Sequence, residues 1–318
     1  MALYLVTGAA GFIGSSLCRT LLEKGEKVRG LDNFSTGKRE NIAPFQSKID
    51  FRDADLLDPA ALKDACAGVD YVLHQAAIPS VPKSVIDPVT SHRANIEGTF
   101  NLLLAAKDAK VKRVVYAASS SAYGETPTLP KREDMAPSPI SPYAVQKLCG
   151  EQYMTSFYRV YGLETVSLRY FNVFGPYQDP TSMYSGVLAK FCTAMLKGEA
   201  PTIYGDGEQS RDFTFIENTV AGNLLAATAP AEKVAGRMFN MATGQRYTLN
   251  QTVEILRGIT GYPGKVNFGE ERKGDIKHSL ADISAAQAAM GYKPSVGFEE
   301  GLKRTVAWYR TQLVPQNA

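Results

Sequence analysis

The 318-residue chain is poor in the residues that build metal sites. It has three histidines and four cysteines (Cys18, Cys66, Cys149 and Cys192), with no CxxC pair and no neighbouring histidine cluster. This scarcity argues against a structural metal and in favour of a reducing compartment. We therefore expect no bound metal and, by default, a cytoplasmic protein.

The sequence also lacks the features of membrane and nucleic-acid proteins. No apolar run approaches the length that spans a bilayer, and a first predicted strand at Leu3 leaves no room for a signal peptide. The net charge is only +3, with Lys and Arg scattered along the chain, so neither nucleic acid nor an acidic membrane is an expected partner. With 44% hydrophobic and 21% charged residues, the composition is that of a globular protein with a sizeable core.

What the chain does contain, near its start, is a glycine turn between two predicted strands. The strands are residues 3–6 and 27–31, and the second one ends at Asp32. The turn and the helix start after it contain Gly8, Gly11, Phe12, Ile13 and Gly14. The glycines let the backbone turn tightly and approach a pyrophosphate at a helix N-terminus, while Asp32 would accept bonds from a ribose hydroxyl and repel a 2′-phosphate. This order predicts an NAD site in an α/β fold with a Rossmann-type, doubly wound parallel sheet.

Tyr143 and Lys147 form a second pattern, one helical turn apart. Pro142 suits the first turn of a helix, so both side chains are expected to start on the same face of a helix that runs to about Tyr161. A cation beside a phenol favours phenolate, which makes the tyrosine a usable proton acceptor near neutral pH. The pattern is short, and an ordinary helical turn is its commoner meaning. Its interpretation therefore depends on finding a cofactor, a third polar partner and a substrate.

A serine triplet supplies candidates for the third partner. Ser119, Ser120 and Ser121 follow a buried strand predicted at residues 113–117, at the sheet edge where open α/β proteins hold their ligands. One of these hydroxyls can bond the substrate oxygen that loses its proton, and the residues alone do not choose among the three.

The GxxGxxG spacing and the Tyr143-x-x-x-Lys147 pair together resemble the extended short-chain dehydrogenase/reductase superfamily. The resemblance implies that Tyr143 and Lys147 are catalytic, that Ser119 is the third catalytic group, and that Ser120 or Ser121 could share its role. It also implies a set of cofactor contacts beyond the glycine turn and Asp32. They are Asn33, Asp55, Leu56, Gln75, Ala76, Ala77, Asn95, Tyr143, Lys147 and Tyr170.

The stretch Arg169-Tyr-Phe-Asn-Val-Phe-Gly-Pro176 resembles the nucleotide-sugar branch of that superfamily. The resemblance implies that Tyr170 packs at the nicotinamide and that Asn172 binds near the diphosphate of a UDP-sugar. Arginine forks suit a diphosphate because they make paired, charge-assisted bonds. The implied substrate contacts are Ser119, Ser120, Ser121, Asn172, Gly186, Val187, Tyr204, Arg211, Arg272, Asp275 and Ser279.

Two serines suggest which reaction the branch member performs. Relatives that dehydrate or decarboxylate the sugar carry an acid where this chain has Ser120 and Ser121, which leaves 4-epimerisation. The chain also resembles the bacterial UDP-N-acetylglucosamine 4-epimerases, and this resemblance implies that Ser279 is a small wall residue where strict UDP-glucose enzymes have tyrosine. The alternatives are a UDP-glucose/UDP-galactose 4-epimerase, a dual enzyme or a UDP-glucuronate 4-epimerase. A non-catalytic NAD-binding scaffold is expected to lack Tyr143, Lys147 or Ser119, and all three are present.

The domain organisation is predicted to be interleaved. Residues 1–176 are expected to form the NAD-binding Rossmann domain, with a strand near 236–242 returning to it. Residues 177–318 are expected to form mainly a smaller nucleotide-sugar-binding domain. The family resemblance also implies a homodimer, formed by the helix near residues 95–109 and the Tyr143 helix.

Overall fold

The structure is a computed structural model that describes residues 1–180, 186–271 and 277–313. Its centre is a seven-stranded sheet with the strand order β11-β6-β5-β4-β1-β2-β3, in which every neighbouring pair is parallel. The strands are β1 (Leu3–Thr7), β2 (Lys27–Asp32), β3 (Asp50–Asp53), β4 (Tyr71–His74), β5 (Arg113–Ser119), β6 (Glu164–Tyr170) and β11 (Arg237–Met241). The predicted fold class, a doubly wound parallel sheet, is confirmed.

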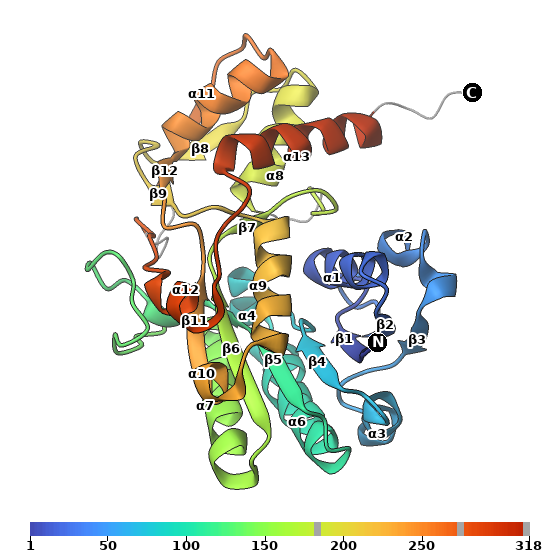
Figure 1. Ribbon diagram of the computed structural model, residues 1–318. Coiled ribbons are helices and arrows are strands. Elements are labelled where there is room, and N and C mark those ends of the chain that lie inside the picture. Colours follow the sequence, from blue (N-terminus) through green and yellow to red (C-terminus); the bar gives the residue numbers. More distant parts are fainter. Residues whose placement is uncertain (181–185, 272–276, 314–318) are drawn as a thin grey trace.

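Alternation along the strands explains why helices cover both faces of the sheet. In β5, Val115 belongs to one buried cluster, whereas Val114 and Tyr116 belong to another on the opposite face. The helices α1 (Phe12–Glu23) and α9 (Ile216–Thr228) pack on the first face (Figure 1). The second face is covered by α3 (Pro59–Cys66), α6 (Gly98–Asp108) and α7 (Pro142–Tyr161).

The remaining elements lie mostly beyond the carboxyl ends of the strands or beside the sheet (Figure 1). The helices are α2 (Arg39–Ile42), η1 (Gln46–Lys48), α4 (Val81–Ile86), α5 (Pro88–His92), η2 (Arg93–Glu97), η3 (Ser120–Tyr123), α8 (Val187–Leu196), α10 (Ala231–Val234), α11 (Leu249–Thr260), α12 (Ser284–Met290) and α13 (Phe298–Leu313). The short strands are β7 (Val173–Phe174), β8 (Thr202–Tyr204), β9 (Ser210–Arg211), β10 (Thr214–Phe215), β12 (Tyr247–Thr248) and β13 (Asn267–Gly269). None of the described helices is both long enough and apolar enough to cross a membrane.

The chain returns to its central sheet late. Strand β11 pairs with β6 at the edge of the sheet, with Met238 opposite Ser167. Between these two strands the chain builds α8 and the β8–β9 region, which stand above the carboxyl edge together with α11 and α13 (Figure 1). The division of the chain at about residue 176 stays a prediction.

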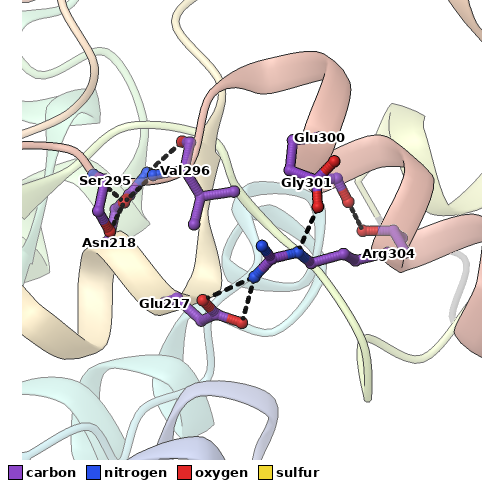
Figure 2. A network of polar contacts seen from close by, with 8 residues as sticks. Glu217, Asn218, Ser295, Val296, Glu300, Gly301 and Arg304 are labelled. Atoms are coloured by element: carbon purple, nitrogen blue, oxygen red, sulfur yellow. Dashed lines mark hydrogen bonds and ion pairs between the residues drawn. The ribbon is translucent and has the colours of Figure 1, made fainter.

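A polar network joins the first turn of α9 to the chain around the start of α13 (Figure 2). The buried Asn218 amide donates to the Val296 carbonyl oxygen at 2.8 Å and accepts from the Ser295 and Val296 amides at 2.9 and 3.1 Å. Beside it, Arg304 of α13 pairs with Glu217 and Glu300 at the surface. These contacts hold the terminal helix on the layer that covers the sheet.

Candidate active site

The glycine turn after β1 has no space for larger residues. Gly8 has a φ of 68°, and a Cβ there would lie 2.8 Å from the Ala76 amide nitrogen. A Cβ on Gly14 would lie 2.0 Å from the Gly8 carbonyl oxygen, so this glycine is needed for close packing of α1 against the turn. Helix α1 begins after Gly11 with no side-chain cap, which leaves the N–H groups of its first turn for a ligand phosphate.

Asp32 ends β2 beside this turn and is almost fully buried. Its carboxylate accepts hydrogen bonds from the Ala10 and Phe34 amides at 2.9 and 2.8 Å, and burial is the main cause that raises its pKa. A carboxylate has about four acceptor positions, so Asp32 keeps capacity for a ribose hydroxyl. Next to it, Asn33 donates to Asp55 at 2.6 Å, which joins two predicted cofactor contacts. This part of the chain therefore fits a dinucleotide.

One cleft of about 1340 Å³ runs from the glycine turn to the elements above the sheet. It brings together most of the predicted site residues. Those lining it are Gly8, Gly11, Phe12, Ile13, Gly14, Asp32, Asn33, Asp55, Leu56, Gln75, Ala76, Ala77, Ser119, Ser120, Ser121, Tyr143, Tyr170, Asn172, Gly186, Arg211 and Ser279. Among the described residues, four predicted ones do not line it: Asn95, Lys147, Val187 and Tyr204. Arg272 and Asp275 lie outside the described residues.

The start of α7 places Tyr143 in the cleft. Pro142 is the first residue of the helix, and the Ser141 hydroxyl caps it by accepting from the Ala144 amide at 3.2 Å. The Tyr143 side chain lies near the Ser119 hydroxyl, which lowers the pKa of the phenol by hydrogen bonding. Ser119 accepts from the Ser121 hydroxyl at 2.8 Å, so these two hydroxyls are joined at the end of β5.

The electrostatics of this pair differ from the sequence-based expectation. Burial raises the pKa of Tyr143 to about 12, and the hydrogen bond with Ser119 only partly opposes it. Lys147 is buried and donates to the Ala117 carbonyl oxygen at 2.8 Å, and burial lowers its pKa to about 7 against the opposing effect of Glu151. A phenolate near neutral pH does not follow from the chain's own groups, because desolvation dominates both residues.

Side-chain amides hold the backbone and the aromatic ring next to the cofactor region. Asn95 accepts from the Ile78 amide at 2.8 Å and donates to Gln146 at 2.8 Å, so it joins the loop after β4 to α7. On the opposite side, the Tyr170 hydroxyl bonds Gln75 at 3.0 Å and Asn223 at 2.8 Å. Asn95 therefore acts from beneath the cleft wall, as a support for its backbone.

At the substrate end of the cleft, several backbone and side-chain groups hydrogen-bond to Asp212. Asn172 donates to the Asp212 carbonyl oxygen at 3.2 Å and to the Ser279 hydroxyl at 3.3 Å. The buried Asp212 carboxylate accepts from the amides of Thr243, Gly244 and Ala281. Burial raises its pKa to about 6. This hub holds two predicted substrate contacts, Asn172 and Ser279, at fixed positions.

Sequence reasoning did not find several of these supports. Four of them each contact a predicted site residue or its backbone: Asn223, Gln146, Ser84 and Asp212. Their partners lie 40 to 59 residues away in the sequence, so no local spacing could reveal them.

Residues 4–242 match the model of the NAD dependent epimerase/dehydratase family. The chain belongs to this family. The sequence-based family assignment and its cofactor, NAD, are confirmed by this match and by relatives solved with NAD.

Three solved structures show how closely the chain follows members of the epimerase/dehydratase family. It is 42% identical to a UDP-N-acetylglucosamine 4-epimerase from Methanobrevibacter ruminantium in complex with UDP-N-acetylmuramic acid, with a TM-score of 0.93 over 98% of this chain and 99% of that one. A UDP-glucose 4-epimerase from Thermotoga maritima with UDP-glucose gives 38% identity, the same TM-score and the same coverage. A UDP-glucuronic acid 4-epimerase from Bacillus cereus with UDP-glucuronic acid and NAD gives 34% identity and a TM-score of 0.88, also over 98% and 99%.

Proposed function

We propose that this family member is a UDP-sugar 4-epimerase that interconverts UDP-N-acetylglucosamine and UDP-N-acetylgalactosamine. The observation that carries the choice of sugar is the small size of Ser279 and Gly186, which line the same cleft as Tyr143 and Asn172. The relative at 42% identity named for the acetylated sugar supports the same choice. Relatives named for UDP-glucose and UDP-glucuronic acid make those two sugars the alternatives.

The proposed chemistry uses the chain's groups as follows. Tyr143 takes the proton of the sugar C4 hydroxyl, with Ser119 bonded to both oxygens, and returns it at the end of the cycle. Lys147 places positive charge beside the phenol and holds the nicotinamide ribose. NAD, when bound, accepts the C4 hydride and gives it back, so none is consumed. Asn172 and Arg211 would hold the diphosphate, which leaves the sugar free to turn and present its other face.

The pKa of Tyr143 makes a specific demand on this scheme. Burial raises that pKa to about 12, so the phenol needs added positive charge to ionise near neutral pH. Lys147 on the same helix face and the cationic ring of oxidised NAD are the two sources of charge that the proposal provides. Oxidised cofactor is therefore expected to be the form that activates Tyr143.

A substrate comparison tests the proposal. Purified protein is incubated with UDP-N-acetylglucosamine, UDP-glucose or UDP-glucuronic acid, without added NADH, and the 4-epimer is measured by NMR. We expect the acetylated sugar to equilibrate with its epimer. If the protein converts UDP-glucose or UDP-glucuronic acid but does not convert UDP-N-acetylglucosamine, the choice of sugar is contradicted. Tyr143→Phe is expected to abolish activity on every substrate, and full activity in that variant would contradict the assigned base.

A homodimer formed through α6 and α7 remains part of the proposal, as does a cytoplasmic location. The dimer is supported by apolar side chains of α7 that are exposed in the single chain: Val145, Val160 and Tyr161 are each about half to two-thirds exposed. Light scattering on the purified protein tests it, and a monomeric mass at micromolar concentration would contradict it.

A further inference from the structure

The backbone N–H of Tyr143 has a partner outside its own helix. Tyr143 is the second residue of α7, where the helix itself provides no acceptor for the amide. The capping hydroxyl of Ser141 is bonded to the Ala144 amide instead. The Tyr143 amide donates to the hydroxyl oxygen of Ser84 at 3.0 Å, across 59 residues of sequence.

The Ser84 hydroxyl is fully buried and held in one orientation. It donates to the Val81 carbonyl oxygen at 2.7 Å within α4 while it accepts from Tyr143. Two backbone groups therefore fix the orientation of this hydroxyl: the Val81 carbonyl oxygen accepts its proton, and the Tyr143 amide donates to its oxygen. Helix α4 begins at a second serine, Ser80, whose side chain accepts from the Lys83 amide at 3.1 Å.

Helices α5 and η2, which follow α4 in the chain, make a second set of hydrogen bonds to the first turns of α7. The Gln146 side chain, three residues after Tyr143, accepts from the Ser91 hydroxyl at 2.7 Å and from the Asn95 amide at 2.8 Å. Helices α4, α5 and η2 therefore hydrogen-bond to this end of α7 at two residues. Helix α4 bonds the backbone of Tyr143, and α5 and η2 bond the side chain of Gln146. The backbone bond is made to the residue that carries the proposed base.

We infer that Ser84 is a positioning residue that sets where the Tyr143 hydroxyl lies in the cleft. The inference rests on the proposed function, because it takes Tyr143 as the base. A phenol ring is rigid, so a tilt of the first turn of α7 is carried directly to its hydroxyl and changes its distance to Ser119. Residues of α4 also line the cleft, including Val81 and Val85, so the helix that holds Tyr143 also forms part of the substrate wall.

The test compares Ser84→Thr with Ser84→Val. These side chains have the same shape and differ only in the hydroxyl, so any difference between the variants reports on that hydroxyl and its two bonds, from the Tyr143 amide and to the Val81 carbonyl oxygen. We expect the valine variant to lose roughly tenfold to a hundredfold in kcat relative to the threonine variant, with KM nearly unchanged. The acid limb of its kcat profile should move to higher pH, because a weakened bond from Ser119 no longer favours the phenolate.

Thr165→Val is the control for a loss of packing or stability. It removes the buried hydroxyl of Thr165 on β6, which donates to the Met154 carbonyl oxygen at 2.7 Å. Met154 lies on α7, the helix that carries Tyr143, but far along it from that residue. This variant should keep the wild-type pH profile. Equal kcat and equal pH profiles in Ser84→Val and Ser84→Thr would overturn the inference, as would a valine defect that Thr165→Val reproduces in full.

Two further measurements keep the test decisive. If the added methyl group prevents folding, Ser84→Ala compared with wild type removes the hydroxyl without adding volume, and the same two kinetic changes are expected. Hydrogen exchange of the Tyr143 amide should be slow in wild type and fast in Ser84→Ala, and fast exchange in wild type would overturn the inference without any assay. Tyr143→Phe is measured in parallel: full activity there defeats the proposed function, whereas an inactive Tyr143→Phe beside an unaffected Ser84→Ala defeats the role of Ser84 alone.

Discussion

The ammonium of Lys147 donates to the carbonyl oxygen of Ala117 at 2.8 Å, from α7 to the neighbouring strand β5. This bond holds a buried cation at the carboxyl half of the strand that ends in Ser119. Burial lowers the pKa of Lys147 to about 7, so its charge near neutral pH depends on what surrounds it. The Glu151 carboxylate, one turn further along α7, favours the charged form, although Arg169 holds that carboxylate in a two-bond pair.

Lys147→Met tests the electrostatic role of that cation. The substitution removes one of the two positive charges that the proposal places beside the buried phenol, so we expect kcat to fall by about 10²- to 10⁴-fold. The residual activity should increase as the pH is raised from 7 to 10, because ionisation of Tyr143 then limits the rate. Lys303→Met, on the exposed surface of α13, is the matched control and should behave like wild type. A Lys147→Met enzyme with the wild-type rate and pH profile would refute the role.

Ser279→Tyr tests the size of the sugar site. Ser279 lies on the cleft and is bonded to Asn172, so a phenol ring at this position would enter the space proposed for the acetamido group. We expect kcat/KM for UDP-N-acetylglucosamine to fall by roughly 10²-fold more than kcat/KM for UDP-glucose. Ser279→Ala should leave the ratio of the two values nearly unchanged. An unaltered ratio in the tyrosine variant would mean that residue 279 does not form the wall.

His74 predicts a defined response of stability to acid. It is buried between the hydroxyls of Thr7 and Thr99, and burial, followed by the charge of Lys147, lowers its pKa from 6.5 to about 3. The unfolded chain therefore binds a proton that the folded chain rejects, and the free energy of unfolding falls as the pH drops from about 6.5 towards 3. The loss amounts to roughly 1.4 kcal/mol per pH unit for one proton.

His74→Gln isolates that contribution, because glutamine can bond both threonines and does not titrate. Urea unfolding at pH 6.5, 5.5 and 4.5 should show a shallower loss of stability in the variant than in wild type. The difference between the two proteins is the relevant quantity, because Asp212, with a pKa raised to about 6, changes stability in the opposite direction in both. Parallel curves would contradict a buried, neutral His74.

The network in Figure 2 contains both a buried set of hydrogen bonds and an exposed set of ion pairs, so their contributions to stability can be compared. Asn218→Ala would leave the Ser295 and Val296 amides without acceptors, and we expect it to lower the free energy of unfolding by about 3 kcal/mol. Arg304→Met breaks two ion pairs but at an exposed position, so its expected cost is below about 1 kcal/mol. Denaturant unfolding measures both, and a larger effect for Arg304→Met would contradict this ranking.

Short sequence patterns predicted those features of the fold that depend on neighbouring residues in the chain. The glycine turn, the start of α7 at Pro142 and its end at Gly162, whose φ is 73°, follow from short-range backbone preferences. Four of the sheet strands, predicted at residues 3–6, 27–31, 113–117 and near 236–242, follow from apolar runs between turn residues. Predicted residues as far apart as Asn33 and Ser279 line one cleft, because parallel strands deliver their loops to one edge.

The supports around the site could not be predicted in this way. Asn223 lies on α9, a helix that the sequence patterns did not single out, and its bond to Tyr170 depends on how α9 packs over the sheet. Ser84 reaches the Tyr143 amide only because α4 packs beside α7. The raised pKa of Tyr143 could not be predicted for the same reason: the pattern shows a neighbouring cation, but the depth of burial is a property of the folded chain.

Strand β11 has a consequence for how the protein is made. It completes the outer edge of the sheet, yet it is formed by residues 237–241, long after its neighbour β6 at residues 164–170. Until the ribosome has delivered that later strand, the open side of β6 presents unpaired N–H and C=O groups that another chain can pair with. Prematurely terminated products that end between these two strands are therefore expected to aggregate, and the growing chain is most in need of chaperone protection during this interval of synthesis.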